Sequence, residues 1–235
     1  MGITSKLSPL PLDDAEILEQ LPEAELLALL TAVAHITDDL EVLDDRLYPN
    51  LLTLREPQSG YTAEQQALAR DIVMRGLRKF RDEQKGVPAR PSLDRLQTIM
   101  QFVAGEPVSE RYVPLLLEEL ALDGDQLRAP QWNKASIAPD REFSAIIIGA
   151  GMSGIAAAHR LRQAGVPVTI LEKNEDVGGT WLENKYPGCR VDIQNHMYSY
   201  SFAQRHDWPF FFSPRQVLHE YFRNCAEEFG LLPII

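Results

Sequence analysis

Residues 143–165 read FSAIIIGAGMSGIAAAHRLRQAG. The β-branched run 145–148 is typical of a short strand, and the residues from Ile155 onward have helical composition. Ala164-Gly165 ends this predicted helix. The glycine-rich segment 149–154 lies between the two elements, so the sequence predicts a strand, a tight turn and a helix in that order.

A second predicted strand, residues 168–171, follows directly and ends in Glu172. Glu172 lies 18 positions after Gly154, close to the spacing of the acidic ribose ligand in dinucleotide-binding folds. Strand, turn, helix, strand and acid together predict a nucleotide-binding site. The alternative is a glycine-rich turn in an unrelated α/β domain.

Each glycine of the turn meets a different steric demand. Gly149 allows the turn, Gly151 lets a diphosphate approach the backbone, and Gly154 lets the helix pack close on the strand. The free N–H groups and the dipole of the helix start attract the anion. A carboxylate at Glu172 would repel a 2′-phosphate but accept hydrogen bonds from a free ribose diol. FAD or NAD is therefore favoured over NADP at this site.

The charge of the chain is uneven. The formal net charge is −11, and residues 1–141 carry 24 acidic and 15 basic side chains, a net of −9. An acidic surface argues against nucleic acid or an anionic membrane as a partner, and a solubilising role is the simpler explanation.

Cysteine use and hydropathy indicate a soluble cytoplasmic protein. Cys189 and Cys225 are the two cysteines, without metal-ligand spacing, so we expect no metal site. The N-terminus lacks the features of a secretory signal, and no run of about 18 apolar residues could span a membrane.

Residues 13–122 have a helical pattern, which predicts four or five amphipathic helices. Pro22 is expected in the first turn of one helix, Thr62 and Gln65 form a predicted capping box, and Ser92 is a predicted N-cap. The helix that follows Ser92 is expected to bury a face that includes Val103. No catalytic constellation occurs here. The surplus apolar surface must pack on the nucleotide-binding domain or on a second copy, which makes a homodimer possible.

Residues 123–141 have the composition of turns and linkers, and we expect burial of Trp132 to anchor them. The predicted fold class is α + α/β. An all-α helical domain with its linker spans residues 1–141, and the first part of a Rossmann-like domain spans residues 142–235.

Beyond Glu172 the sequence contains DVGGTW at 176–181, YPGCRVD at 186–192 and YSYSF at 198–202. This ordered set resembles the FAD-binding segment of type I Baeyer–Villiger monooxygenases. Together with RAPQW at 128–132, it is most similar to the 4-hydroxyacetophenone monooxygenases, in which a helical extension precedes the flavin domain. The resemblance covers nearly the whole chain.

The resemblance implies roles for individual residues. Ser153 and the three glycines of the turn would meet the FAD pyrophosphate, and Glu172 would meet the adenosine ribose. Other parts of the flavin site would involve Gly179, Thr180, Trp181, Asp192, Ile193 and Tyr198. In the family, the aspartate matching Asp192 supports an arginine that acts at the flavin and helps to hold NADP. Core packing of Trp181 and Tyr198, and a loop-capping role for Asp192, remain alternatives.

By this resemblance the protein is an FAD- and NADPH-dependent monooxygenase that uses O2 to convert ketones, aryl ketones above all, into esters or lactones. The sequence lacks a second GxGxxG for NADPH and the FxGxxxHxxxW signature. We therefore expect an N-terminal part of a longer enzyme, whose NADPH-binding domain is not in this chain. The alternatives are a related flavin monooxygenase that oxygenates nitrogen or sulfur, and a non-catalytic helical assembly module joined to an incomplete nucleotide fold.

Overall fold

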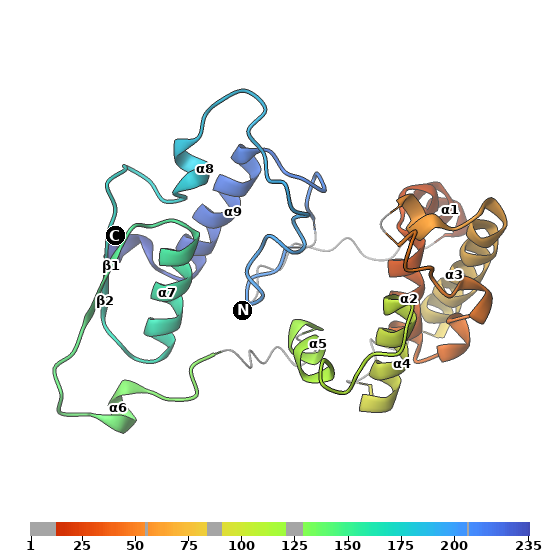
Figure 1. Cartoon of the computed structure of the whole chain (residues 1–235), viewed down its shortest axis with the longest axis horizontal. Helices are drawn as coiled ribbons and strands as arrows, with labels where there is room; N and C mark the ends of the chain where they lie inside the picture. Colours follow the sequence, from red (N-terminus) through yellow and green to blue (C-terminus); the bar gives the residue numbers. More distant parts are fainter. Residues whose placement is uncertain (1–12, 55, 84–90, 121–128, 206) are drawn as a thin grey trace. The chain divides into compact units, whose positions relative to one another are not determined.

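The computed structural model describes residues 13–54, 56–83, 91–120, 129–205 and 207–235. The described residues fall into two compact units, 13–120 and 129–235. In the first, which we call the helical unit, the described elements are all helical, whereas the second contains a sheet as well as helices (Figure 1). We call the second the nucleotide unit. The predicted α + α/β fold class is confirmed.

The helical unit combines α-helices with short 3-10 turns. Their bounds are α1 (Asp14–Gln20), η1 (Leu21–Glu23), α2 (Leu26–Thr37), η2 (Leu40–Val42), η3 (Asp45–Leu47), η4 (Pro57–Gly60), α3 (Ala63–Glu83), α4 (Leu93–Ala104) and α5 (Val113–Leu120).

The centre of the helical unit is the packing of α2 on α3. Leu30 and Val33 of α2 and Val73 of α3 are completely buried. The predicted capping box at the start of α3 is confirmed, because the amide of Thr62 donates to Gln65 Oε1 at 3.0 Å and the amide of Gln65 donates to Thr62 Oγ1 at 3.2 Å. The chain's own side chains thus satisfy these helix-start amides.

Three details of the helical unit differ from the sequence prediction. Pro22 lies in η1, before α2 begins. Ser92 is the N-cap residue of α4, but its side chain makes no capping hydrogen bond. Leu96 and Met100 of α4 are buried as expected, whereas Val103 is 40% exposed and its neighbour Phe102 packs in the core of the helical unit.

The nucleotide unit is built on a two-stranded parallel sheet in the order β1-β2. The register pairs Ala145 with Val168 and Ile148 with Leu171. The described elements of this unit are α6 (Lys134–Ile137), β1 (Ala145–Ile148), α7 (Met152–Gln163), β2 (Val168–Leu171), α8 (Thr180–Glu183), α9 (Arg215–Glu228) and η5 (Leu232–Ile234).

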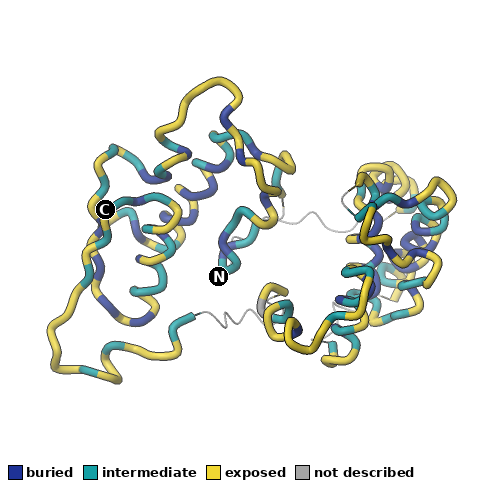
Figure 2. The backbone as a smooth tube through the Cα atoms, viewed as in Figure 1, coloured by how far each residue is buried: buried dark blue, intermediate teal, exposed yellow. Residues whose placement is uncertain are grey.

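The sheet of the nucleotide unit is covered on one face. Val168 and Ile170 of β2 pack in a core that includes Ile155 of α7 and Phe222 of α9. The alternate positions of β1 are exposed, with Ile148 at 89%, and Figure 2 shows the mixture of buried and exposed backbone in this region.

A partly buried histidine lies beside this core. The ring of His159, on α7, stacks on the ring of Phe202 with 4.9 Å between centroids, and it meets the ring of Phe229 at a tilt with 4.0 Å between centroids. Its Nε2 atom is buried without a hydrogen-bond partner. Burial lowers the pKa of His159 to about 4, and the positive charges of Arg160 and Arg162 act in the same direction.

The described part of the expected linker, residues 129–141, lies within the nucleotide unit. The amide of Lys134 donates to the carbonyl of Ala164 at 2.8 Å, next to the end of α7. Trp132 is 47% exposed, so the prediction that its burial anchors the segment is wrong. Backbone contacts at α6 hold the segment instead.

No helix among the described residues combines the length and the apolar character that crossing a membrane requires.

Candidate functional site

Glycines build the turn between β1 and α7. Gly149 has φ of +96°, and its amide donates to the carbonyl of Leu171 at 2.7 Å. A Cβ atom at Gly154 would overlap the carbonyl oxygen of Gly149. Helix α7 therefore begins directly against the end of β1, which is the close packing predicted for Gly154.

The first turn of α7 carries backbone N–H groups without helical acceptors, at Met152, Ser153 and Gly154. The N-cap residue is Gly151, which has no side chain to accept from them. The 12-residue helix adds the positive end of its dipole at the same place. This helix start can bind an anion such as a diphosphate.

The carboxylate of Glu172 faces the glycine turn. Its Oε2 accepts from the amide of Ala150 at 2.6 Å. Its Oε1 accepts from the amide and from the side-chain Nδ2 of Asn174, each at 2.9 Å. The Ala150 amide, followed by the amide and side chain of Asn174, holds the pKa of Glu172 below its ordinary value. Glu172 is therefore ionised at neutral pH and acts as a hydrogen-bond acceptor.

A polar network joins Glu172 to the end of α8. Asn174 Nδ2 also donates to Glu183 Oε1 at 2.8 Å, and Lys173 Nζ lies 2.9 Å from the same oxygen. The carboxylate after β2 and the last residue of α8 are thus linked through one asparagine side chain.

A second glycine-rich segment lies against the turn. We call residues 176–179, of sequence DVGG, the diglycine loop. The amide of Gly178 donates to the carbonyl of Ala150 at 3.0 Å. A Cβ atom at Gly179 would lie 3.0 Å from Cα of Gly151. Two stretches of side-chain-free backbone are therefore in contact.

These segments border two cavities, of about 530 Å³ and 320 Å³, that share Gly149, Gly151 and Gly179 in their walls. The larger cavity is lined by Ile148, Gly149, Gly151, Leu171, Glu172, Lys173, Gly179 and Glu183. The smaller one is lined by Ile148, Gly149, Gly151, Met152, Ser153, Gly154, Gly178, Gly179, Thr180, Trp181 and Tyr198. Most residues singled out from the sequence are thus brought together.

Trp181 has a structural role as well as a place in the wall of the smaller cavity. It is 7% exposed and belongs to the core of the nucleotide unit. Its Nε1 donates to the hydroxyl of Tyr198 at 3.3 Å, and the two rings meet edge to face. Arg215 of α9 donates to the carbonyl of Trp181 at 2.9 Å. Packing and site lining therefore coexist at this tryptophan.

Asp192 and Ile193 do not line either cavity. Both are exposed. They lie beside Val191, whose amide donates to the carbonyl of Ser213 at 3.1 Å. The structure therefore orders this segment but does not bring these two side chains to the glycine turn.

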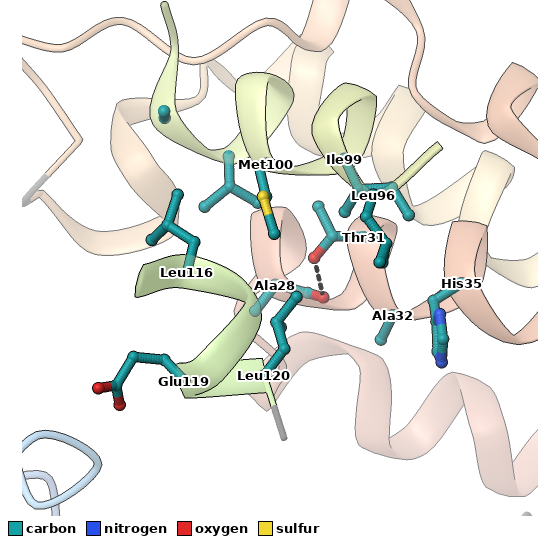
Figure 3. A pocket seen from close by; sticks show the side chains of 12 residues that line it. Ala28, Thr31, Ala32, His35, Leu96, Ile99, Met100, Leu116, Glu119 and Leu120 are labelled. Atoms are coloured by element: carbon teal, nitrogen blue, oxygen red, sulfur yellow. Dashed lines mark hydrogen bonds between the residues drawn. The ribbon is translucent and has the colours of Figure 1, made fainter. Parts of the chain in front are cut away.

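The helical unit contains a cavity of a different kind, of about 490 Å³, between α2, α4 and α5 (Figure 3). Leu116 and Leu120 of α5 point toward α2 and α4 across it. The Thr31 hydroxyl at its wall already donates to the carbonyl of Ala28 at 2.8 Å. Its lining consists of Ala28, Thr31, Ala32, His35, Leu96, Ile99, Met100, Val103, Ala104, Leu116, Glu119 and Leu120.

Sequence reasoning missed Asn174 and Lys173, and it included Gly178 in the DVGGTW run without giving it a role of its own. An asparagine two positions after a carboxylate can hydrogen-bond locally, and this was the available signal for Asn174. The roles of Gly178 and Lys173 depend on contacts with residues distant in sequence.

The nucleotide unit offers the chemistry that a dinucleotide requires. Backbone amides without side-chain caps suit a diphosphate, and the ionised Glu172 suits a ribose hydroxyl. Gly149, Gly151 and Gly179 contribute backbone without side chains to both cavity walls, which admits close approach. Among the described residues, no cluster of His, Cys, Asp and Glu could hold a metal ion.

Comparison with known proteins agrees with this geometry. The family described as "NAD(P)-binding Rossmann-like domain" matches residues 147–211. An uncharacterized monooxygenase y4iD of Sinorhizobium fredii is 31% identical over 225 residues, which are 95% of this chain and 33% of the relative. A Baeyer–Villiger monooxygenase of Streptomyces coelicolor is 44% identical over 88 residues, which are 37% of this chain and 17% of the relative. The FAD-binding monooxygenase moxY of Dothistroma septosporum is 46% identical over 94 residues, which are 39% of this chain and 15% of the relative.

The chain thus spans at most about a third of the length of these relatives. The relatives share the monooxygenase description, and the shorter matches cover 88 and 94 residues of this chain. The chain is thus similar to the corresponding part of proteins named Baeyer–Villiger monooxygenase and FAD-binding monooxygenase.

Proposed function

We propose that the protein acts as an FAD- and NADPH-dependent monooxygenase that converts ketones, aryl ketones in particular, into esters or lactones with O2. The observation that carries the proposal is the position of Glu172, whose Oε2 lies 2.6 Å from the Ala150 amide at the start of a helix without a side-chain cap. Its relatives include proteins named Baeyer–Villiger monooxygenase and FAD-binding monooxygenase.

In this proposal the amides of Met152, Ser153 and Gly154 hold the FAD diphosphate, while Gly149 and Gly151 allow its approach. Glu172 accepts a hydrogen bond from the adenosine ribose. Bound FAD would supply the redox chemistry that takes electrons from NADPH and activates O2. The protein positions the flavin and excludes water around it.

The smaller cavity is proposed as the path toward the flavin ring. Gly179, Thr180, Trp181 and Tyr198 line it. The hydrogen bond from Trp181 to Tyr198 fixes the orientation of both rings, so that this wall would remain rigid when the cofactor binds.

We also propose that Asp192 and Ile193 act in the flavin site, with Asp192 supporting an arginine from outside this chain. Both residues are exposed and therefore accessible to such a partner. Their segment is held by Asn195, which is buried and whose Nδ2 donates to the carbonyl of Phe210 at 2.7 Å.

NADPH would bind elsewhere, because the ionised Glu172 repels a 2′-phosphate at this site. The remaining partners proposed are a small-molecule ketone and O2, without nucleic acid or membrane, in the cytoplasm. A homodimer through the helical unit is proposed from its exposed apolar side chains, such as Leu115 at 47% and Leu120 at 46%. Sedimentation of residues 1–141 tests the homodimer, and a monomer at micromolar concentration would contradict it.

Two measurements test the enzymatic proposal. The purified chain should bind FAD and become yellow, with the flavin absorbance retained after gel filtration. The longer protein should consume NADPH in the presence of an aryl ketone and O2. Oxidation of amines or sulfides without any ketone turnover would favour the heteroatom-oxygenating alternative, and a chain that binds no FAD would contradict the proposal.

A further inference from the structure

The diglycine loop forms a wall of the proposed FAD site. It contacts the glycine turn on one side and helix α9, which lies outside the nucleotide-binding motif, on the other. Gly179 borders both cavities. On the side of the glycine turn, the Gly178 amide donates to the Ala150 carbonyl at 3.0 Å. The other side of the loop rests on α9, more than 30 residues further along the chain.

His219 of α9 makes this second contact. Its Nε2 lies 3.0 Å from the carbonyl oxygen of Val177 and 3.4 Å from Oδ2 of Asp176. A carbonyl oxygen can only accept, so His219 carries a proton on Nε2 and donates it to the loop. The side chain of Val177 is itself buried at 2% exposure, which fixes the peptide that accepts this bond.

The imidazole ring also packs on the loop backbone. A Cβ atom at Gly178 would lie 2.6 Å from Cδ2 of His219, and Gly178 has φ of +118°. Both observations require glycine at this position. One turn further along α9, Arg223 Nε lies 3.3 Å from Oδ2 of Asp176. Since Arg223 is half-exposed, its ion pair is the weaker of the two attachments.

We propose that His219 is a positioning residue of the cofactor site, which holds the diglycine loop against the glycine turn through its hydrogen bond to the Val177 carbonyl. This inference rests on the proposed function. His219 itself lines neither cavity. Its removal would leave the Val177 carbonyl without its donor and would let Gly179 move relative to Gly151.

The test measures FAD affinity of the whole chain by isothermal titration calorimetry for wild type, His219→Leu and His219→Gln. Leucine fills similar space without a donor, so FAD binding should weaken about tenfold, as expected for one lost hydrogen bond to a partly buried carbonyl. Glutamine presents an N–H donor at similar reach. His219→Gln should therefore bind FAD within about twofold of wild type.

Arg162→Met is the matched control for the general packing of α9. Arg162 Nη1 donates to the carbonyls of Phe229 and Gly230, at 3.0 and 2.6 Å. These two residues follow the C-terminal end of α9 and lie about ten positions after His219 in the sequence. Thermal unfolding of each variant monitors stability. Arg162→Met should lower the midpoint and leave FAD affinity within about twofold of wild type.

The outcomes separate the inference from the proposed function. If wild type binds FAD and His219→Leu binds it equally well, the positioning role is overturned while the proposed function stands. The role is also overturned if His219→Gln is as weak as His219→Leu, or if Arg162→Met weakens FAD binding to the same extent. If wild type does not bind FAD, both the proposed function and the positioning role are overturned.

Discussion

Helices α3 and α7 differ in how the backbone amides at their starts, which lack acceptors within the helix, find hydrogen-bond partners. At α3, Thr62 and Gln65 satisfy backbone amides reciprocally. At α7, the N-cap is Gly151, which offers no side chain. The start of α3 thus satisfies its donors with the chain's own side chains, whereas the start of α7 leaves them for a ligand. A binding site arises here where the chain gives up a local source of stability.

The largest expected effect is from Gly154→Ala in the nucleotide unit. The added Cβ would meet the backbone carbonyl of Gly149, which cannot move without breaking the turn. We expect a loss of about 3 kcal/mol in the free energy of unfolding of this unit. Urea denaturation followed by circular dichroism measures it.

Gly76→Ala in α3 is the matched control from the helical unit. There the added Cβ would meet Cγ1 of Val33, which is part of a side chain, and alanine also favours the helix by up to about 1 kcal/mol. The loss should be smaller than for Gly154→Ala. Equal losses at the two glycines would contradict the close packing assigned to the turn.

The second effect concerns the acid at the end of β2. Glu172→Gln replaces a charged acceptor that holds the Ala150 amide, so FAD binding should weaken by about 2 kcal/mol. Calorimetric titration with FAD measures the difference. Glu183→Gln, which alters the same network at a site without contact to Ala150, should bind FAD more tightly than Glu172→Gln. The reverse order would refute the role of Glu172.

The third test exchanges the two ways of starting a helix. Thr62→Ala should lower the stability of the helical unit by about 1 kcal/mol and leave FAD binding unchanged. Gly151→Ser would give α7 a capping hydroxyl, and φ of −75° suits serine at this position. Stability should rise by only a few tenths of a kcal/mol, with weaker FAD binding. A Gly151→Ser variant that binds FAD as tightly as wild type would argue against binding of FAD by the uncapped amides at the start of α7.

The fourth test concerns a difference in pH dependence between the two units. The pKa of His159 in the folded protein is about 4, below its ordinary value of 6.5. Between these two pH values the unfolded chain therefore binds more protons at this residue than the folded chain does. The stability of the nucleotide unit is then complete above pH 6.5 and falls as pH decreases toward 4, by on the order of 1 kcal/mol after solvent screening. Hydrogen bonds from Arg46 lower the pKa of Asp44 to about 2, so the helical unit loses this contribution only below pH 4.

His159→Phe should keep the stacking with Phe202 and Phe229 and remove the titration. Denaturation at pH 7 and pH 4 should therefore show a smaller loss for the variant than for wild type. An equal loss in both proteins would show that another group causes the pH dependence.

Local patterns in the sequence were sufficient for much of the nucleotide unit. Strand, turn, helix and acid follow one another within 30 residues, and each depends on neighbours in the chain, as Gly149 and Gly154 illustrate. The capping box at Thr62 was predictable for the same reason, because its partners are three residues apart.

Features that depend on distant contacts were not predictable. Burial was expected for Trp132, but its segment attaches through the amide of Lys134 to Ala164. Phe102, near the end of α4, is buried in the core of the helical unit while Val103 is 40% exposed, and periodicity alone does not predict this. His219 reaches the diglycine loop across 42 residues, and its spacing in the sequence carries no sign of this contact.

The proposed cofactor site depends above all on the bare amides at the start of α7, which would hold a diphosphate. The most direct measurement is a titration of the isotopically labelled chain with ADP, followed through the amide resonances in two-dimensional NMR. We expect the resonances of Met152, Ser153 and Gly154 to shift most and to saturate together, while those of the α3 start remain in place. Binding of ADP without shifts at these three amides, or no binding, would contradict it.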